Sequence, residues 1–89
     1  MKQIKTGGKF RKDLKRYQNK REKLEKLYEI VGFLQQDIAI PKEFKPHMLS
    51  GYYIGCMECH IENDLLLIWI DEEENVIKLI RFGTHSEVF

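Results

Sequence analysis

The spacing of apolar residues changes along this chain, and the change occurs at a pair of prolines, Pro41 and Pro46. Before them, apolar side chains recur every three or four positions, first from Phe10 to Tyr17 and again from Leu24 to Ile38. That spacing predicts two amphipathic helices, the second of which ends at the prolines. After the prolines the period becomes two, which is typical of β-strands. The sequence therefore predicts an α+β fold with its helices first.

Three segments after the prolines have the composition of strands: residues 52–61, 65–70 and 76–82. We expect the first to bend at Gly55, and the second, an unbroken apolar run, to be a central strand buried on both faces. Polar turns are expected at residues 63–64 and 71–75. Residues 1–6 alternate weakly and are a candidate short strand, and residues 84–89 are expected to form a short tail.

These elements are expected to form a single domain, residues 1–89, because a chain of this length builds one modest core. The two helices would pack on one face of a small antiparallel sheet of three to four strands, which gives two layers. Hydrophobic residues make up 43% of the chain and charged residues 33%, a balance that excludes a disordered protein.

The formal net charge is only +1, but the charge is divided unevenly along the chain. Residues 1–36 hold 11 basic and 4 acidic side chains, a balance of +7, and residues 37–89 hold 4 basic and 10 acidic, a balance of −6. Such an asymmetry indicates contact with a polyanion on one side of the molecule and a different role for the other side.

Several other classes of protein are excluded by the sequence. No apolar run approaches the roughly 18 residues that a membrane-spanning helix needs. The first residues, from Met1 to Lys5, lack the apolar segment of a signal peptide. We therefore expect no membrane partner and a cytoplasmic location, in which the two cysteines stay reduced.

The residues from Cys56 to His60 spell C-x-x-C-H, the pattern of covalent haem attachment. In a strand, however, positions 56 and 59 face opposite sides, so the two thiols would not reach one haem. A structural zinc site would need a second pair of ligands, and the sequence has no further cysteine pair. We expect no cofactor and no metal.

All three histidines, His47, His60 and His85, lie in the second half at or near element boundaries. Each taken singly is read as a surface or structural histidine. Glu58 and His60 are two positions apart and share a face of their strand, whereas Cys59 faces the core. Histidines near carboxylates and a guanidinium have the chemistry of metal-free phosphoryl transfer from a 2′-hydroxyl, which needs a base, an acid and a cation.

Three motifs of the second half resemble a known family: His47-Met-Leu-Ser-Gly51, Glu58-Cys-His-Ile-Glu-Asn-Asp64, and Arg81-Phe-Gly-Thr-His-Ser-Glu-Val-Phe89. The pattern is similar to the YafQ branch of the RelE/ParE superfamily, the toxins of type II toxin–antitoxin modules. The resemblance covers nearly the whole chain and implies a RelE-like fold. It also implies an mRNA interferase that cuts mRNA in the A site of the 70S ribosome without a metal, by attack of a ribose 2′-oxygen on the adjacent phosphate.

The active-site positions of the family correspond to His47, His60, Asp64, Arg81, His85 and Phe89. The resemblance implies that His85 is the general acid, which protonates the leaving 5′-oxygen. His60 or Asp64 would be the base or its orienting partner. Arg81 would hold the scissile phosphate, and Phe89 would stack on a base or order the tail.

Two positions depart from the family pattern. Met57 stands where an arginine is usual, and Asn63 replaces a proline in the turn that presents Asp64. Neither change removes a proton-transfer group, so reduced activity or an altered codon preference is the expected consequence. Glu58 is a further candidate, which would position His60 or Arg81.

The basic residues of the first helix form a candidate RNA-binding surface: Lys9, Arg11, Lys12, Lys15, Arg16 and Lys20. They would contact ribosomal RNA phosphates; the alternative is a solvated helix face. The family also implies a RelB/DinJ-like antitoxin as the protein partner. Two other functions stay open. One is a ParE-like or degenerate toxin that inhibits its target without cutting RNA, against which the histidines argue, and the other is a free nucleic-acid-binding module, which would leave them without a role.

Overall fold

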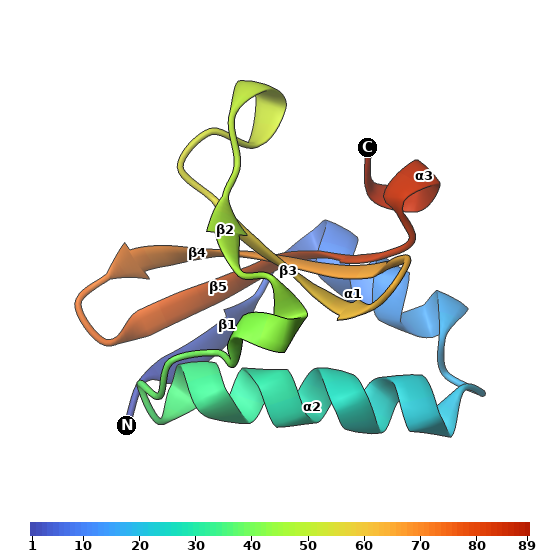
Figure 1. Ribbon diagram of the computed structural model, residues 1–89, viewed down its shortest axis with the longest axis horizontal. Helices are drawn as coiled ribbons and strands as arrows, with labels where there is room; N and C mark the ends of the chain where they lie inside the picture. The colour runs from blue at the N-terminus through green and yellow to red at the C-terminus, as the bar shows by residue number, and fades with distance from the viewer.

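The computed structural model describes the backbone of residues 1–89 and every side chain except that of Glu73. The elements in chain order are β1 (Gln3–Thr6), α1 (Gly8–Arg16), α2 (Arg21–Gln35), η1 (Lys42–Phe44), β2 (His47–Met48), η2 (Gly51–Tyr53), β3 (Met57–Glu62), β4 (Leu65–Glu73), β5 (Val76–Gly83) and α3 (His85–Val88). They form one five-stranded sheet in the order β1-β5-β4-β3-β2 (Figure 1). None of the helices in the described part of the chain has the length and apolar character needed to cross a membrane.

The two predicted N-terminal helices are confirmed, and the second ends earlier than its apolar pattern. α2 stops at Gln35, and Asp37 then takes a positive φ of 58°. The Ile38 N–H donates to the Phe33 carbonyl at 2.8 Å, and the Asp37 N–H to the Leu34 carbonyl at 3.2 Å. This pair of bonds is a Schellman motif, which satisfies the last carbonyls and turns the chain away from the helix axis.

The α+β fold class is confirmed, but the sheet has five strands and is mixed rather than antiparallel. β3, β4 and β5 pair antiparallel, in agreement with the three predicted strand segments. The candidate strand at the N-terminus is β1, and it pairs parallel with β5, with Gln3 opposite Val76. A two-residue β2 adds the opposite edge. Both edges are short strands and carry little periodic signal, so the sequence marks β1 only as a candidate and does not predict β2.

The predicted long strand over residues 52–61 is wrong in its first half, because the strand begins only at Met57. Gly51 and Gly55 both adopt positive φ, 71° and 89°, and between them the chain makes the short η2 turn. The Leu49 N–H donates to the Cys56 carbonyl at 2.9 Å and closes this segment into a loop. Glycines tolerate these left-handed conformations, and their repetition interrupts the extended backbone that a strand requires.

The expected tail after Gly83 is also wrong, because residues 85–88 form the short helix α3. Thr84 and Glu87 make a capping box, in which each side chain binds the other residue's backbone N–H. Such reciprocal bonds stabilise the first turn of a helix. The capping box thus orders the C-terminal segment beside the sheet.

Both faces of the sheet are covered, each by a different group of elements. Figure 1 shows α2 along one face, and α3 with the loop after β2 rising from the other. The main core includes Phe10, Leu27, Cys59, Leu67 and Phe82; a smaller core on the other face contains Tyr53, Cys56, Leu66, Ile68 and Val88. β4 contributes side chains to both cores, which confirms it as the doubly buried central strand.

Candidate active site

The pairing register of the sheet assembles the candidate residues on the face of the smaller core. His47 lies opposite Glu58, Glu58 opposite Ile68, and Ile68 opposite Arg81, so one row crosses β2, β3, β4 and β5. Residues directly opposite one another project to the same face. Ile68 belongs to the smaller core, which identifies the face. Tertiary pairing therefore places His47, Glu58 and Arg81 in one row across the sheet, with Ile68 between Glu58 and Arg81, although 34 positions separate the first from the last.

His47, Glu58 and His60 form a cluster at the β2 edge, which we call the histidine cluster. The Glu58 side chain is buried, with 5% of its surface exposed. Its Oε1 lies 3.0 Å from His47 Nε2 and 3.9 Å from His60 Nε2. Its Oε2 is buried with no hydrogen-bond partner among the described residues. The two imidazole centroids are 6.1 Å apart. The prediction that Glu58 and His60 share one face is confirmed.

The contacts of His47 require an extra proton in this cluster. Its Nδ1 lies 2.7 Å from the Lys45 carbonyl, which only accepts, so Nδ1 carries a hydrogen. A neutral imidazole has one N–H, and Nε2 would then face the Glu58 carboxylate with a lone pair. A hydrogen bond across this contact needs a proton on Nε2 or on the carboxyl group. The geometry of the His47–Glu58 contact thus fits a proton shared between the two groups.

His85, Asp64 and Phe89 form a second group at the start of α3. The Asp64 Oδ1 accepts a hydrogen bond of 2.8 Å from the His85 backbone N–H, which fixes the turn between β3 and β4 against α3. The His85 imidazole stacks on the Phe89 ring, with centroids 4.7 Å apart and an interplanar angle of 29°. Stacking on Phe89 holds the His85 ring in place, and because His85 is exposed, its imidazole stays accessible.

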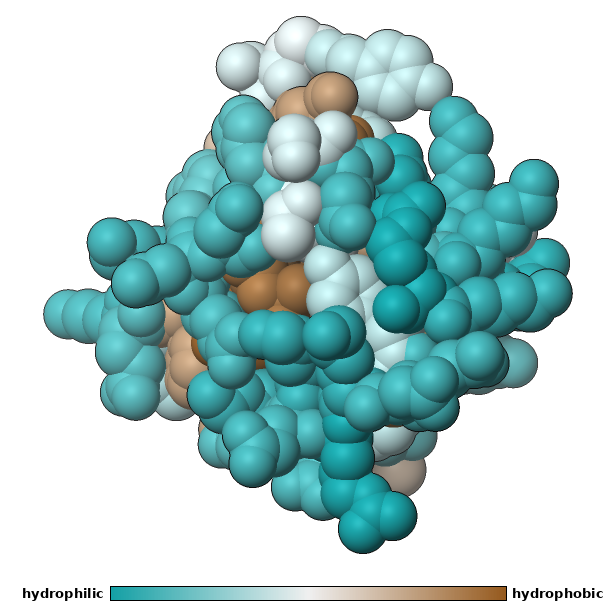
Figure 2. Space-filling model, turned by 90° about the vertical axis from the view of Figure 1, so that its right-hand side faces the viewer, coloured by the Kyte–Doolittle hydropathy of each residue, from teal (hydrophilic) through white to brown (hydrophobic). Residues whose placement is uncertain are grey.

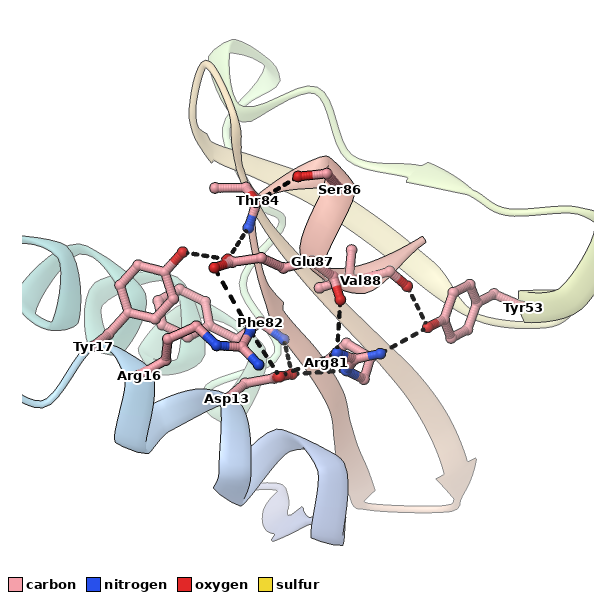
Figure 3. A network of polar contacts seen from close by, with 10 residues as sticks. All are labelled: Asp13, Arg16, Tyr17, Tyr53, Arg81, Phe82, Thr84, Ser86, Glu87 and Val88. Carbon is pink, nitrogen blue, oxygen red and sulfur yellow. Dashed lines mark hydrogen bonds and ion pairs between the residues drawn. The ribbon is translucent and has the colours of Figure 1, made fainter.

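Arg81 lies at the centre of a polar network between α1, the loop after β2 and α3 (Figure 3). Its Nε and Nη2 donate to both oxygens of Asp13 at 2.8 and 3.1 Å. Nη2 also donates to the Glu87 carbonyl at 3.0 Å, and Nη1 reaches Tyr53 Oη at 3.4 Å. The hydrogen bonds to Asp13 raise the pKa of the guanidinium above its ordinary value. The guanidinium is thus largely occupied within the protein.

Sequence reasoning missed Asp13 and Tyr53, the two residues whose side chains contact the Arg81 guanidinium. Asp13 is 2% exposed and also accepts the Phe82 backbone N–H at 2.9 Å. It lies three positions after Phe10 and four before Tyr17, so it sits on the apolar stripe of α1. A carboxylate on an apolar stripe signals a buried partner. The sequence holds no comparable signal for Tyr53, whose Oη donates to the Val88 carbonyl at 2.7 Å.

Glu87 extends the network towards α1. Its Oε1 accepts hydrogen bonds from Tyr17 Oη at 2.6 Å and from the Thr84 N–H at 2.8 Å. Burial works to raise the pKa of Glu87, but these bonds and the nearby Arg16 lower it overall. Burial, and next the bond to the Glu87 carboxylate, raise the pKa of Tyr17 to about 12. α3 is therefore tied to the C-terminal end of α1 by the hydrogen bond between Tyr17 and Glu87.

The two cysteines of the C-x-x-C-H pattern lie in different cores. Cys56 packs in the smaller core and Cys59 in the main core, on the opposite face of the sheet. Burial, reinforced by the charge of Glu58, raises the pKa of the Cys59 thiol to about 12. Within the described residues, no three His, Cys, Asp or Glu side chains converge on a point where a metal ion would bind.

The six candidate RNA-contacting residues on and after α1 are all exposed. Arg11 donates to the Thr6 carbonyl at 2.6 Å, and Arg16 lies 3.7 Å from Glu87 Oε2, so these two also serve the fold. Figure 2 looks at the side on which α1 and the start of α2 lie in Figure 1, and its surface is dominated by hydrophilic side chains. The helix thus presents a cationic surface beside the C-terminal segment.

Comparison with known proteins agrees with the fold and the motifs. A family model described as bacterial toxin of type II toxin–antitoxin system, YafQ, matches residues 2–89. The mRNA interferase toxin YafQ of Escherichia coli (strain K12) is 29% identical over 87 residues, which cover 97% of this chain and 94% of that protein.

Solved structures show the same similarity. A metal-bound toxin from Helicobacter pylori is 39% identical and superposes with a TM-score of 0.88 over 100% of both chains. A chain of the E. coli DinJ-YafQ complex is 28% identical, with a TM-score of 0.85 over 100% of this chain and 99% of that one. The chain therefore belongs to the YafQ family of bacterial toxins of type II toxin–antitoxin systems and is a homologue of the YafQ mRNA interferases.

Proposed function

We propose that this protein cuts mRNA in the A site of the ribosome by acid–base catalysis. The 2′-oxygen of one nucleotide forms a bond to the adjacent phosphorus, and the bond from that phosphorus to the 5′-oxygen of the next nucleotide breaks. A base takes the 2′-hydroxyl proton, and an acid gives a proton to the 5′-oxygen. The observation that carries this proposal is the buried Glu58 carboxylate between two imidazoles, with one oxygen lacking a partner.

The histidine cluster supplies the base side of this reaction. His60 is half-buried, and its Nε2 lies 3.9 Å from Glu58 Oε1, which lets it receive a proton and be stabilised by the carboxylate. We assign His60 as the base and Glu58 as the carboxylate whose charge stabilises the protonated imidazole. His47 contacts the same carboxylate oxygen at 3.0 Å. A buried carboxylate beside a histidine is a recurring arrangement in proton-transfer sites.

His85 supplies the acid side. Its exposed imidazole is fixed by stacking on Phe89 and by the bond from its backbone N–H to Asp64. Because that bond occupies one oxygen of Asp64, we assign Asp64 to holding His85 rather than to taking the 2′-hydroxyl proton. An imidazole can hold a proton and release it near neutral pH, which suits the role of the acid.

Arg81 acts mainly through the elements that it holds. Its Nε and Nη2 are bound to Asp13 and to the Glu87 carbonyl, and one N–H of Nη1 reaches Tyr53 Oη, so only the second N–H of Nη1 is left to approach a phosphate. We therefore assign Arg81 to positioning α3, and with it His85 and Phe89, in addition to any contact of Nη1 with the scissile phosphate.

Two partners complete the proposal. The basic residues of α1 dock the protein on ribosomal RNA phosphates in the cytoplasm, with a dependence on salt. The similarity to a chain of the DinJ-YafQ complex supports a RelB/DinJ-like antitoxin that binds and neutralises this toxin.

The test is cleavage of a defined mRNA on purified ribosomes by the wild-type protein and by His85→Ala. Loss of the general acid is expected to slow cleavage about 10²- to 10⁴-fold. Ser86→Ala, one residue further on the exposed side of α3, is the matched control and should cut at the wild-type rate. A His85→Ala protein that cuts as fast as wild type would contradict the acid assignment. An intact A-site codon at saturating wild-type protein would favour the ParE-like toxin that binds without cutting.

A further inference from the structure

A groove of about 310 Å³ opens beside α3, next to the proposed general acid but distinct from the histidine cluster. Tyr52, Tyr53 and Phe89 form its aromatic walls, and Lys9 and Arg81 approach it from α1 and β5. The sequence motifs do not include Tyr52 or Tyr53. Tyr53 belongs to the Arg81 network, and Tyr52 has no role in the mechanism proposed above. An aromatic groove with a few polar groups is the usual form of a site for a flat ligand.

The rings of the groove form a continuous series that ends at His85. Tyr52 meets Tyr53 edge to face, with centroids 4.9 Å apart at 90°, and Tyr53 meets Phe89 at 5.3 Å and 89°. Phe89 in turn stacks on His85. Tyr53 is 8% exposed, whereas Tyr52 is 83% and Phe89 54% exposed. Two exposed rings thus stand on a buried third ring, and Tyr52, the more exposed of the two, presents the most surface to a ligand.

The charges around the groove favour an anionic ligand. Lys9 is exposed and makes no hydrogen bond or ion pair with the described residues. Arg81 is compensated by Asp13, whose two oxygens it contacts. Glu87 also borders the groove, but its carboxylate is bound by Tyr17 and the Thr84 N–H and lies near Arg16. Lys9 is therefore the uncompensated charge at this place, and it suits a phosphate.

We propose that this groove binds the base of the nucleotide on the 3′ side of the cut, with Tyr52 stacked on the base and Lys9 at its 3′-phosphate. The inference rests on the proposed function, in which His85 protonates the 5′-oxygen of that nucleotide. Because Phe89 is both the stacking partner of His85 and a wall of the groove, the base of the leaving nucleotide lies nearest to these rings. Stacking of a base on an aromatic side chain tolerates every base, so the groove contributes affinity more than sequence choice.

The test combines a variant of Tyr52 with a change in the mRNA. Tyr52→Ala is expected to lower kcat/KM for ribosomal cleavage about 5- to 100-fold, while Tyr52→Phe keeps most of it, because the ring and not the hydroxyl stacks. An mRNA with an abasic nucleotide on the 3′ side of the cut should lower wild-type kcat/KM by a similar factor. The same mRNA should add nothing to the loss in Tyr52→Ala, as expected for two changes that remove one contact.

Tyr28→Ala is the matched control. Tyr28 is an exposed tyrosine, 59% accessible, on α2 at the other face of the sheet, and its loss should leave cleavage unchanged. If wild type cuts, and Tyr52→Ala cuts equally well and stays sensitive to the abasic nucleotide, the proposal is wrong. The same conclusion follows if Tyr52→Ala weakens only the binding of the antitoxin, because the groove would then be a protein-binding surface.

A binding experiment separates this inference from the proposed function. Adenosine 3′-monophosphate, which carries the phosphate that Lys9 would contact and a free 5′-hydroxyl, is titrated into the wild-type protein, and the NMR signals of Tyr52, Tyr53 and Phe89 are followed. Shifts confined to these rings, absent in Tyr52→Ala, are expected whether or not the protein cuts mRNA. If wild type fails to cut but the shifts occur, the proposed reaction is wrong and the nucleobase groove stands. If these signals do not move at any nucleotide concentration, the groove is not a nucleobase site.

Discussion

Two buried carboxylates, Asp13 on α1 and Glu58 on β3, differ in how completely their oxygens are paired. Asp13 is 2% exposed, and its oxygens meet the Arg81 guanidinium and the Phe82 N–H. Glu58 is 5% exposed, and one of its oxygens has no partner among the described residues. The difference teaches that burial alone does not mark a functional group, because both side chains are equally hidden. The complete pairing of Asp13 is typical of a structural group, whereas the incomplete pairing of Glu58 fits the role in proton transfer that we propose for it.

The reason is energetic. A buried polar atom without a partner costs about 1–3 kcal/mol, a large share of the stability of a small domain. Such a cost persists where the unpaired group has another use, such as exchanging a proton with a neighbour. Glu58 lies within reach of two imidazoles, whereas Asp13 faces a guanidinium that always stays charged. Proton transfer is therefore available to the first carboxylate and closed to the second.

The largest expected effect comes from removing Asp13. Asp13→Ala leaves the guanidinium of Arg81 and the Phe82 N–H without a partner, so the free energy of unfolding should fall by about 3–5 kcal/mol. Urea unfolding followed by circular dichroism measures it. Asp71→Ala, which removes an exposed partner of Lys2, is the control and should cost less than about 1 kcal/mol. Equal losses of stability in Asp13→Ala and Asp71→Ala would show that Asp13 is not a structural carboxylate, and its contrast with Glu58 would fail.

Glu58→Gln is expected to have a smaller effect, which falls on cleavage and not on the stability of the fold. The amide has nearly the shape of the carboxyl group but holds no negative charge, so the protein should unfold at the same or a higher urea concentration. Cleavage on the ribosome should slow about 10- to 100-fold, because His60 loses the charge that stabilises its protonated form. Glu62→Gln, on the same strand but bound to Lys23 and Lys26, is the control. A variant that is less stable yet fully active would assign Glu58 to structure.

The smallest expected effect concerns the pH dependence of the Tyr17–Glu87 hydrogen bond. The pKa of Glu87 is lowered from its ordinary value of 4.5, so its contribution is complete above about pH 4.5 and is lost as the pH falls through the lower, folded-state pKa. The pKa of Tyr17 is raised from 10.0 to about 12, so its contribution is complete below pH 10 and is lost as the pH rises towards 12.

Tyr17→Phe should therefore lower the stability by about 1 kcal/mol near neutral pH and weaken both pH dependences. Thermal unfolding at a series of pH values measures this. The control is Tyr28→Phe, which removes a hydroxyl from an exposed ring and should leave the curve unchanged. A Tyr17→Phe curve parallel to that of the wild type at both ends would show that this bond does not link α3 to α1.

Much of the fold and part of the site could be predicted from local patterns. The change of apolar period indicated the helices and the strands β3, β4 and β5, because each pattern reports which side of its own element is buried. The strand period also placed Glu58 and His60 on one face. The motifs indicated the histidines, and through the resemblance to YafQ toxins they indicated the family, which the comparisons show.

The sequence by itself thus determined what is written within a few neighbouring residues: the type and buried face of the long elements, and the family motifs. Only the tertiary structure decided the parallel pairing of β1, the row from His47 to Arg81 and the bond between Arg81 and Asp13, 68 positions away. It also decided that the guanidinium expected to hold a phosphate is held by the protein. The physical reason is that pairing register and hydrogen-bond satisfaction arise between distant segments, and no local period records which partner a polar side chain will meet.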